Sequence, residues 1–307
     1  MDNKWKMALA LLVVFSVIVI AALIFFLASF LDEVYVFGDK VAVIPVKGVI
    51  TMEGCPTTFG GPSCAHVDTI KDLLKEADED SSVKSIVLEI NSGGGYVVAS
   101  RELTRAVKAT KKPVVAWIGE AGASGAYYAA SGADLIVADE DSITGSIGVI
   151  MSLSHYYDLF SWLGINTTTI KSGTYKDSGS PYRPMTEEEH AMFQKLIDDV
   201  NDDFVEEVSL NRNFSLEYAR SISDGSIYLG SRAKELGLVD ELGGLEAAID
   251  LAAELGEIRG KPKVQRAEPE QHLLDLLSRL STNIGYGLGR AFVEAGRPQP
   301  NLYRSLS

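Results

Sequence analysis

Histidine, cysteine and basic side chains are scarce in this sequence, and each shortage argues against a class of function. The 307 residues include only 4 histidines and 2 cysteines, and their spacing is not that of a zinc site. Lysine and arginine number 28 against 42 aspartates and glutamates, so the net charge is -14. Phosphate binding needs clustered cations, so this charge argues against a nucleic-acid partner.

Long apolar runs are also absent, with one exception near the N-terminus. Residues 7–31 read MALALLVVFSVIVIAALIFFLASFL, interrupted only by Ser16 and Ser29. A helix of this length reaches about 37 Å, enough for a hydrocarbon core of about 30 Å. The alternative is a cleaved signal peptide, which has a shorter apolar stretch and ends at a small-x-small site that is not evident here. The run predicts a transmembrane helix over residues 7–31.

Charges on either side of this run predict its orientation. Lys4 and Lys6 precede it, whereas Asp32 and Glu33 follow it. The positive-inside rule then puts residues 1–6 in the cytoplasm and everything from residue 32 onward outside. We expect a single-pass protein of the cell membrane, with an extracytoplasmic domain over residues 32–260 and a C-terminal helical extension and tail over residues 261–307.

The two cysteines flank one short loop. Cys55 and Cys64 bound the segment CPTTFGGPSC, in a compartment where disulfides persist. A bridge between them would restrict this loop by about 2 to 3 kcal/mol. Two unpaired thiols are the alternative, and the bridge is the interpretation we favour.

Strand and helix patterns alternate along the middle of the chain. Strands are expected at 41–50, 85–90, 113–119, 133–138, 147–151 and 165–173, and helices at 66–77, 97–109, 124–131 and 156–163. This alternation is typical of parallel strands joined by crossover helices, and therefore predicts an α/β fold. In such a fold the site lies at the carboxyl ends of the strands.

A long helix is expected from Thr186 to about Leu210. Thr186 stands three residues before Glu189, which is the spacing of a capping box, and acidic residues fill the first turn. An apolar stripe then continues along one face. This helix would hold the loop that precedes it. The stretch from 261 reads as a linker, followed by an apolar stripe over 272–294.

Four motifs contain residues suited to catalysis: INSGGGY (90–96), AGASGAYYAA (121–130), TGSIGVI (144–150) and KSGTYKDSGSP (171–181). A glycine triplet allows backbone N–H groups to face an oxyanion. Ser124 begins a helix of small residues, where N–H donors stabilise developing negative charge. Taken singly, the same features are explained by a tight turn and an N-cap serine.

A serine nucleophile needs a general base, and the sequence leaves two kinds open. Among His66, His155, His190 and His272, only His155 is expected near a strand end, so a Ser-His-Asp site has little support. Lys176 occupies a Gly/Ser-rich loop, where its pKa would have to fall from about 10.4 toward about 7 to 8. Ser146 could orient its amine. The alternative for Lys176 is a solvated side chain paired with Asp177.

Together with DGSIYLGSRAKELGLVDELGGLEAAI (224–249), these motifs closely resemble the signal peptide peptidase A family over about residues 41–250. Five spaced motifs match in register. The family belongs to the Clp-protease/crotonase-like superfamily, whose fold is a spiral of ββα units. The resemblance therefore implies a Ser-Lys serine protease with this α/β fold, preceded here by the N-terminal transmembrane helix.

The resemblance also implies roles for individual residues. Ser124 matches the nucleophile, Lys176 the general base and Ser146 the serine that positions the lysine. The N–H groups of Gly95 and Gly125 match the oxyanion hole. No metal or organic cofactor is implied.

Partners follow from the resemblance as well. It implies hydrophobic peptide substrates, such as remnant signal peptides near the membrane, and a homo-oligomeric ring. In short members of the family, neighbouring subunits can complete one active site. Two departures, Gly93 where proline is common and Ala126 where glycine is common, concern the shape of the substrate pocket rather than the catalytic groups.

Three other functions remain open from the sequence. An acyl-CoA enzyme of the crotonase type shares the glycine-rich loop but would bind coenzyme A. A catalytically silent membrane scaffold would use the ring for assembly alone. Membrane proteases associated with stomatin-like partners also use Ser and Lys, but usually carry further membrane spans after the protease domain.

Overall fold

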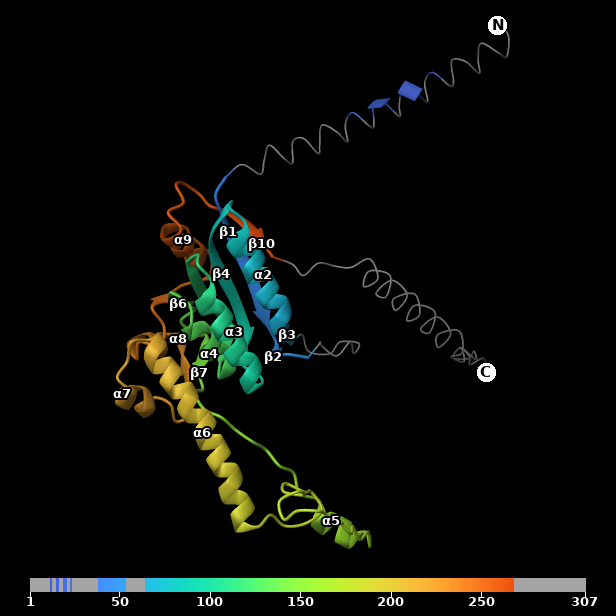
Figure 1. Ribbon diagram of the computed structural model, residues 1–307. Coiled ribbons are helices and arrows are strands. Elements are labelled where there is room, and N and C mark those ends of the chain that lie inside the picture. Colours follow the sequence, from blue (N-terminus) through green and yellow to red (C-terminus); the bar gives the residue numbers. More distant parts are fainter. Residues whose placement is uncertain are drawn as a thin grey trace, which may run out of the picture. The chain divides into compact units, whose positions relative to one another are not determined.

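The computed structural model describes residues 38–53 and 64–267, together with six separate positions between residues 12 and 23. One mixed sheet forms the centre of this part, with strand order β10-β1-β4-β5-β6-β9 (Figure 1). Its members are β1 (Lys40–Lys47), β4 (Val83–Ser92), β5 (Val114–Ala123), β6 (Leu135–Ala138), β7 (Ile143–Gly145), β8 (Ile227–Leu229), β9 (Glu241–Leu242) and β10 (Lys263–Arg266). A separate parallel pair consists of β2 (Val49–Thr51) and β3 (Cys64–His66).

Parallel pairing dominates the sheet. Each neighbouring pair along the main path is parallel, and β7 adds to β5 in parallel as well. Only β8 is antiparallel, against β7. The helices are α2 (Val67–Glu79), α3 (Val97–Ala109), α4 (Gly125–Ser131), α5 (Tyr157–Trp162), α6 (Glu187–Asn211), α7 (Leu216–Ser221), α8 (Gly230–Glu235) and α9 (Leu245–Leu255). The predicted α/β class is confirmed.

Helices bury both faces of the sheet, which explains why its strands are apolar at nearly every position. On β1, Ile44 faces the larger core, built with α2, α3 and α4, whereas Val43 faces a smaller core closed by α9. Ala248 and Ala252 of α9 pack there against Val43 and its neighbours on β4, β5 and β6. This two-sided burial fixes the strand ends that are followed by the motifs with the candidate site residues.

Three sequence-based expectations for local structure are wrong. Residues 147–151 and 165–173 form no strand, although their β-branched residues favour extended backbone. A strand needs a partner, and β7 ends at Gly145, where its free edge is taken by β8. Conversely, β10 lies within the stretch from 261 that was expected to be a linker, and it pairs with β1.

Helix α6 begins with the predicted capping box. The Thr186 side chain accepts a hydrogen bond from the Glu189 N–H, and the Glu189 carboxylate accepts one from the Thr186 N–H. Its apolar stripe is buried only toward the C-terminal end, at Phe204, Val205 and Val208. Leu196, on the same predicted stripe, is exposed.

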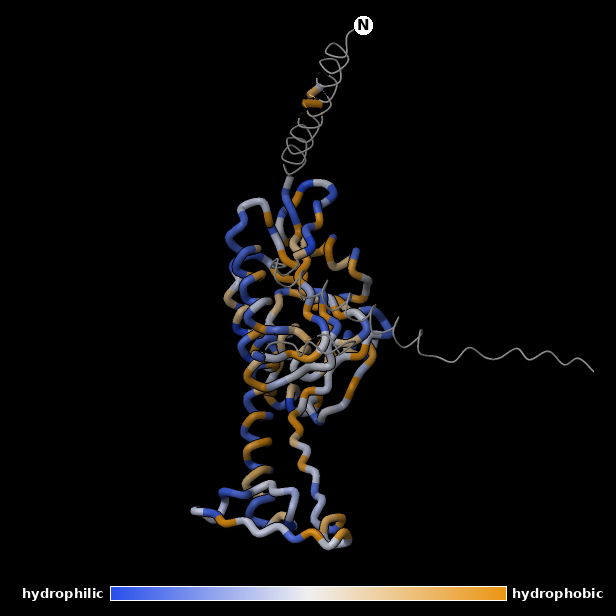
Figure 2. The backbone as a smooth tube through the Cα atoms, turned by 90° about the vertical axis from the view of Figure 1, so that its right-hand side faces the viewer, coloured by the Kyte–Doolittle hydropathy of each residue, from blue (hydrophilic) through white to orange (hydrophobic). Residues whose placement is uncertain are grey.

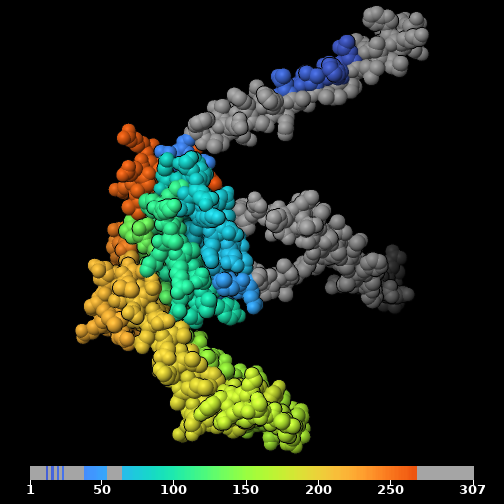
Figure 3. Space-filling view, in the orientation of Figure 1, coloured from blue at the N-terminus to red at the C-terminus, as the bar shows by residue number. Residues whose placement is uncertain are grey.

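An arm, which we define as residues 151–196, extends from the sheet and contains α5 and the first part of α6 (Figures 1 and 3). Glu189 is its one buried residue. Hydrophobic residues recur along its backbone (Figure 2), and the side chains of Trp162 and Ile170 are 81% and 97% exposed. The arm is therefore an exposed extension with no apolar core of its own.

Several predictions fall outside the described residues. These are most of the transmembrane helix at 7–31, Cys55 and the apolar stripe over 272–294. Cys64, the first residue of β3, is not a free thiol, but the bridge to Cys55 stays a prediction. Among the helices that the structure describes, none combines the length and the apolar character needed to cross a membrane.

Candidate active site

Ser124 lies at the sharp turn between β5 and α4. Its φ of 53° and ψ of -126° place it outside the regions that side-chain-bearing residues normally adopt, at a cost of about 1 to 3 kcal/mol. The surroundings impose this conformation: the Ser124 N–H donates to the carbonyl of Gly145 at 2.8 Å, and its own carbonyl accepts from the N–H of Tyr128 at 2.9 Å. The backbone thus fixes the serine at the carboxyl end of β5.

The glycine triplet follows β4 and packs against this turn. The Ile50 N–H donates to the Gly94 carbonyl at 3.1 Å, and the Ile50 carbonyl accepts from the Tyr96 N–H at 3.0 Å. A Cβ on Gly95 would lie 2.1 Å from the Ile50 oxygen, and one on Gly94 would lie 2.8 Å from the Gly125 nitrogen. Only glycine permits these two approaches.

The two predicted oxyanion donors lie next to each other. A Cβ on Gly125 would be 3.3 Å from the Gly95 nitrogen. Within residues 38–53 and 64–267, neither the Gly95 N–H nor the Gly125 N–H donates to another backbone or side-chain group. Two unpaired N–H donors beside a serine hydroxyl are what the stabilisation of a tetrahedral oxyanion requires.

Ser146 occupies a second strained turn. It follows Gly145 with a φ of 51°, and its N–H donates to the Ser226 carbonyl at 2.7 Å. Thr144, in the preceding strand, anchors this turn through a hydrogen bond from its hydroxyl to the Gly122 carbonyl at 2.8 Å. The segments around residues 122–124 and 144–146 are thereby held in register.

A pocket of about 570 Å³ joins these features. Four of the predicted site residues line it: Gly95, Ser124, Gly125 and Ser146. Helix α6 contributes a further wall with apolar and polar side chains, among them Ile197, Asn201 and Phe204. The structure thus brings together the predicted nucleophile, both oxyanion donors and the predicted lysine-orienting serine.

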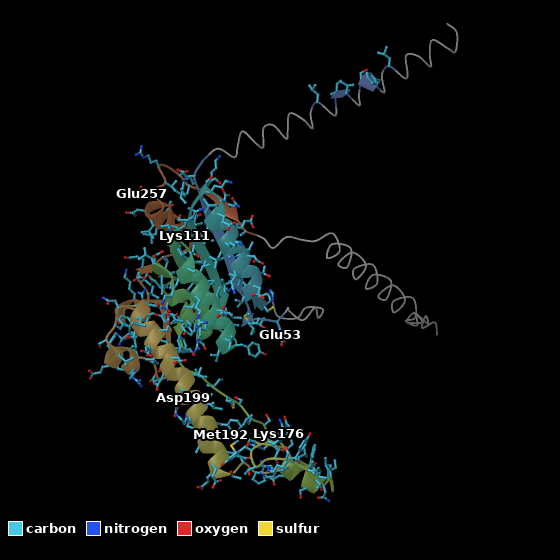
Figure 4. All side chains as sticks on the ribbon, in the orientation of Figure 1. Glu53, Lys111, Lys176, Met192, Asp199 and Glu257 are labelled. Atoms are coloured by element: carbon cyan, nitrogen blue, oxygen red, sulfur yellow. The ribbon has the colours of Figure 1, made fainter. Side chains whose placement is uncertain are left out.

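Lys176 lies elsewhere in this chain. It is an exposed residue of the arm and does not line the pocket; Figure 4 shows it beside the N-terminal part of α6, near Met192. The Lys176 N–H donates to the Gly173 carbonyl at 3.2 Å, which closes a turn. Within one chain, the predicted base is therefore not assembled with the predicted nucleophile.

An ion-pair network holds the loop around Lys176. Arg183 donates to Asp177 at 2.9 Å and to Glu189 at 2.8 Å, and Lys171 donates to Asp177 at 2.6 Å. Hydrogen bonds from Arg183 and then Lys171 hold the pKa of Asp177 well below its usual range. Hydrogen bonds from Arg183 and then from the Thr186 N–H lower the pKa of Glu189 to about 2. Asp177 is thus engaged by Lys171 and Arg183 rather than by Lys176.

Histidine does not enter the pocket from the described part of the chain. His66, His155 and His190 are absent from its lining, and His272 lies outside the described residues. Two pocket residues, Ser100 on α3 and Asn201 on α6, were missed by sequence reasoning. Each occupies an ordinary position in a helical pattern, and no local motif marks it.

One protein-family model and several known proteases match the chain. The sequence model of peptidase family S49 matches residues 106–259. The chain is 47% identical to "Putative protease MJ0651" of Methanocaldococcus jannaschii, over 71% of each chain. It is 37% identical to "Putative signal peptide peptidase SppA" of Enterococcus faecium, over 69% of this chain and 62% of that protein.

A solved structure also aligns with the chain. It is a mutant of the 1510-N membrane-bound stomatin-specific protease in complex with a substrate peptide. The alignment has 15% identity and a TM-score of 0.48, and it covers 80% of this chain and 99% of the other.

Proposed function

Because the chain belongs to peptidase family S49 and is a serine protease, we propose that it is a membrane-anchored endopeptidase with a Ser-Lys dyad. Ser124 is the nucleophile and Lys176 the general base. Its substrates are remnant signal peptides and other hydrophobic peptides near the membrane. The observation that carries this proposal is the pocket in which Ser124, Ser146, Gly95 and Gly125 meet.

The proposed reaction proceeds through an acyl-enzyme. Neutral Lys176 takes the hydroxyl proton of Ser124 as the serine oxygen attacks the peptide carbonyl. The resulting oxyanion accepts hydrogen bonds from the Gly95 and Gly125 N–H groups, each worth about 3 to 4 kcal/mol. Collapse breaks the C–N bond, and the lysine proton passes to the leaving amine. Lys176 then takes a proton from water as the water oxygen attacks the ester, and it passes this proton to the Ser124 oxygen as the acyl C–O bond breaks.

The exposed position of Lys176 supports a site shared between subunits. We infer that the arm of one subunit delivers Lys176 to the Ser124 pocket of its neighbour in a homo-oligomeric ring. Ser146, already in the pocket, would accept a hydrogen bond from the incoming amine. Enclosure between two subunits would also remove Lys176 from water, which is how burial lowers a lysine pKa.

Membrane attachment belongs to the same proposal. Residues 7–31 would anchor the protein, with the N-terminus in the cytoplasm and the protease domain outside the cell membrane. We also infer that the sheet and its helices form the ββα spiral of Clp-protease and crotonase-like proteins. An anchored site lies close to peptides that are released into or beside the bilayer.

The test uses the full chain in detergent micelles with hydrophobic signal-like peptides. Ser124→Ala and Lys176→Ala should each lower kcat by at least about 10⁴-fold. A fluorophosphonate probe should label Ser124 in the wild type and should label the Lys176→Ala variant poorly. Peptide cleavage that survives Ser124→Ala would refute the proposal, and coenzyme A binding would favour the crotonase alternative. A wild type that neither cleaves peptides nor reacts with the probe would favour the silent scaffold.

A further inference from the structure

Three described side chains contain a buried polar atom without a hydrogen-bond partner: Ser85 Oγ, Ser100 Oγ and Asn201 Oδ1. Buried polar atoms in folded proteins are nearly always paired, because an unpaired one has lost its hydration without compensation. Two of these three atoms belong to residues that line the Ser124 pocket. Their concentration there indicates polar groups that are kept for a bound molecule.

Ser100 is the more deeply placed of the two. It lies in the first turn of α3, five residues after Gly95, and it is 1% exposed. Its backbone is fully used: the N–H donates to the Tyr96 carbonyl at 2.9 Å, and the carbonyl accepts from the Thr104 hydroxyl at 2.8 Å. Only the Ser100 hydroxyl remains unpaired.

This hydroxyl occupies the space beside Gly125. A Cβ on Gly125 would lie 2.1 Å from Ser100 Oγ and 3.3 Å from the Gly95 nitrogen. Ser100 Oγ and the Gly95 nitrogen therefore both lie beside Gly125, whose own N–H is the second predicted oxyanion donor. The contact also explains why residue 125 carries no side chain, since its φ is not in the left-handed region.

The chemistry of this arrangement restricts what the hydroxyl can bind. The unpaired Gly95 and Gly125 N–H groups both require an acceptor, and a serine hydroxyl rotates freely to donate to one. An oxygen that accepts from these N–H groups is the natural partner for the third donor. In a protease that oxygen is the substrate carbonyl, which gains negative charge as the serine attacks.

We propose that the Ser100 hydroxyl is a third hydrogen-bond donor to the substrate's carbonyl oxygen, beside the Gly95 and Gly125 N–H groups. This inference rests on the proposed function, because it requires attack by Ser124 on a peptide. It adds a catalytic group that comes from α3, an element outside the nucleophile turn and the glycine loop.

The variant Ser100→Ala in the full-length protein tests the inference. It should lower kcat by about 10- to 100-fold with little change in KM, which is at or below the effect known for one oxyanion donor. A peptide aldehyde, which forms a tetrahedral adduct with Ser124, should bind more weakly by a similar factor. The melting temperature should stay equal or rise, because a buried unpaired hydroxyl has been removed.

Ser85→Ala is the matched control. Ser85 Oγ is also buried and unpaired, but Ser85 lies on β4 away from the pocket, with its hydroxyl near Gly256. This variant should show the same melting behaviour with unchanged kcat. Ser100→Cys, with a weaker donor of similar size, should fall between Ser100→Ala and the wild type.

Two results would overturn the inference while leaving the proposed function intact. One is wild-type kcat and aldehyde affinity in Ser100→Ala. The other is a loss of activity that only follows a lower melting temperature, which would show a packing role. If the wild type itself does not cleave peptides, it is the proposed function that fails.

Discussion

The pocket and the arm are built in opposite ways. Around Ser124 the chain is enclosed, since Ala123, Gly125, Ala126 and Tyr127 are all buried. In the arm that carries Lys176 a single residue out of 151–196 is buried. One chain therefore suffices to fix the proposed nucleophile and oxyanion donors, whereas the proposed base, Lys176, stays exposed in a single chain.

The same contrast is visible in apolar surface. Ile150, Trp162 and Ile170 are 89%, 81% and 97% exposed, all in or next to the arm. Large exposed apolar side chains gathered in one region are typical of surfaces that bind another protein. The uncovered arm thus agrees with the proposal that a neighbouring subunit receives it.

The most direct test of this difference between pocket and arm is to place an intact Ser124 and an intact Lys176 on different subunits. Ser124→Ala and Lys176→Ala subunits are each expected to be inactive. Mixed after dissociation and reassembled, they should recover roughly a quarter of the wild-type rate if each site combines residues of two neighbours. Peptide cleavage before and after mixing measures this. If both variants are inactive alone and mixing restores nothing, the dyad is formed within one chain.

The next largest effect is expected within the pocket itself. Gly125→Ala would place a Cβ 2.1 Å from Ser100 Oγ, so either the Ser100 hydroxyl or the turn must move, and either movement disturbs the proposed oxyanion site. We expect kcat to fall by about 100- to 1,000-fold. Gly93→Ala is the control, because no atom lies within 4 Å of its Cβ position. Equal kcat values for the two variants would show that the close approach is unimportant.

Two arginines, one beside the sheet and one in the arm, are expected to differ in what their loss affects: the stability of the sheet or the rate of cleavage. Arg212 is 8% exposed and donates to Asp240 and to the Gly237 carbonyl, next to the sheet. Arg212→Met should lower the free energy of unfolding by about 3 kcal/mol, because a buried pair loses one partner. Chemical denaturation followed by circular dichroism measures this change.

The corresponding substitution in the arm, Arg183→Met, should lower the rate of peptide cleavage rather than the stability of the sheet. Arg183→Met removes the link between Asp177 and Glu189, and the melting temperature of the sheet should not change. Misplacement of the Lys176 loop should lower kcat by about 10- to 100-fold. A large drop in melting temperature with Arg183→Met would mean that the arm and the sheet unfold as one unit.

The smallest expected effect is a loosening of the arm in acid. Arg183 lowers the pKa values of Asp177 and Glu189. Their contribution to the stability of the folded arm is therefore complete above about pH 4, and it is lost as the pH falls toward the pKa values that the two groups have in the folded protein. For Glu189 that value is about 2. Pepsin digestion between pH 4 and pH 2 should cut the arm before the sheet.

Glu189→Gln provides the control for this acid effect, since it removes the titrating group and should weaken the pH dependence of cleavage in the arm. Cleavage of the arm that is unchanged between pH 4 and pH 2 in the wild type would argue against a role for the two carboxylates.

Sequence reasoning was most accurate where local pattern and tertiary packing agree. The helix at 97–109 was predicted to the residue, because its apolar spacing matches the face that it buries. The capping box at Thr186 and Glu189 is equally local. The motifs also indicated Ser124, Gly95, Gly125 and Ser146, which the fold brings to one pocket.

The misses have physical causes. The run INTTTIKSG (165–173) has the composition of a strand but finds no partner in the arm. Ser100 carries no local signal, because its importance comes from a contact with Gly125 that only the folded chain creates. The position of Lys176 relative to Ser124 depends on how the arm meets its surroundings, and no pattern within one chain encodes that.

The length of α6 determines both how far its N-terminal end lies from the sheet and in which direction that end faces. Its 25 residues span about 37 Å, between the capping box at one end and Phe204, stacked on Tyr128 at 4.5 Å, near the other. A helix of this length fixes both the distance and the rotation between its two ends. Removing one residue would shorten it by only about 1.5 Å but would turn its tip by about 100°. In the proposed shared site, such a deletion would leave the reach of the arm almost unchanged but would change the direction in which Lys176 points.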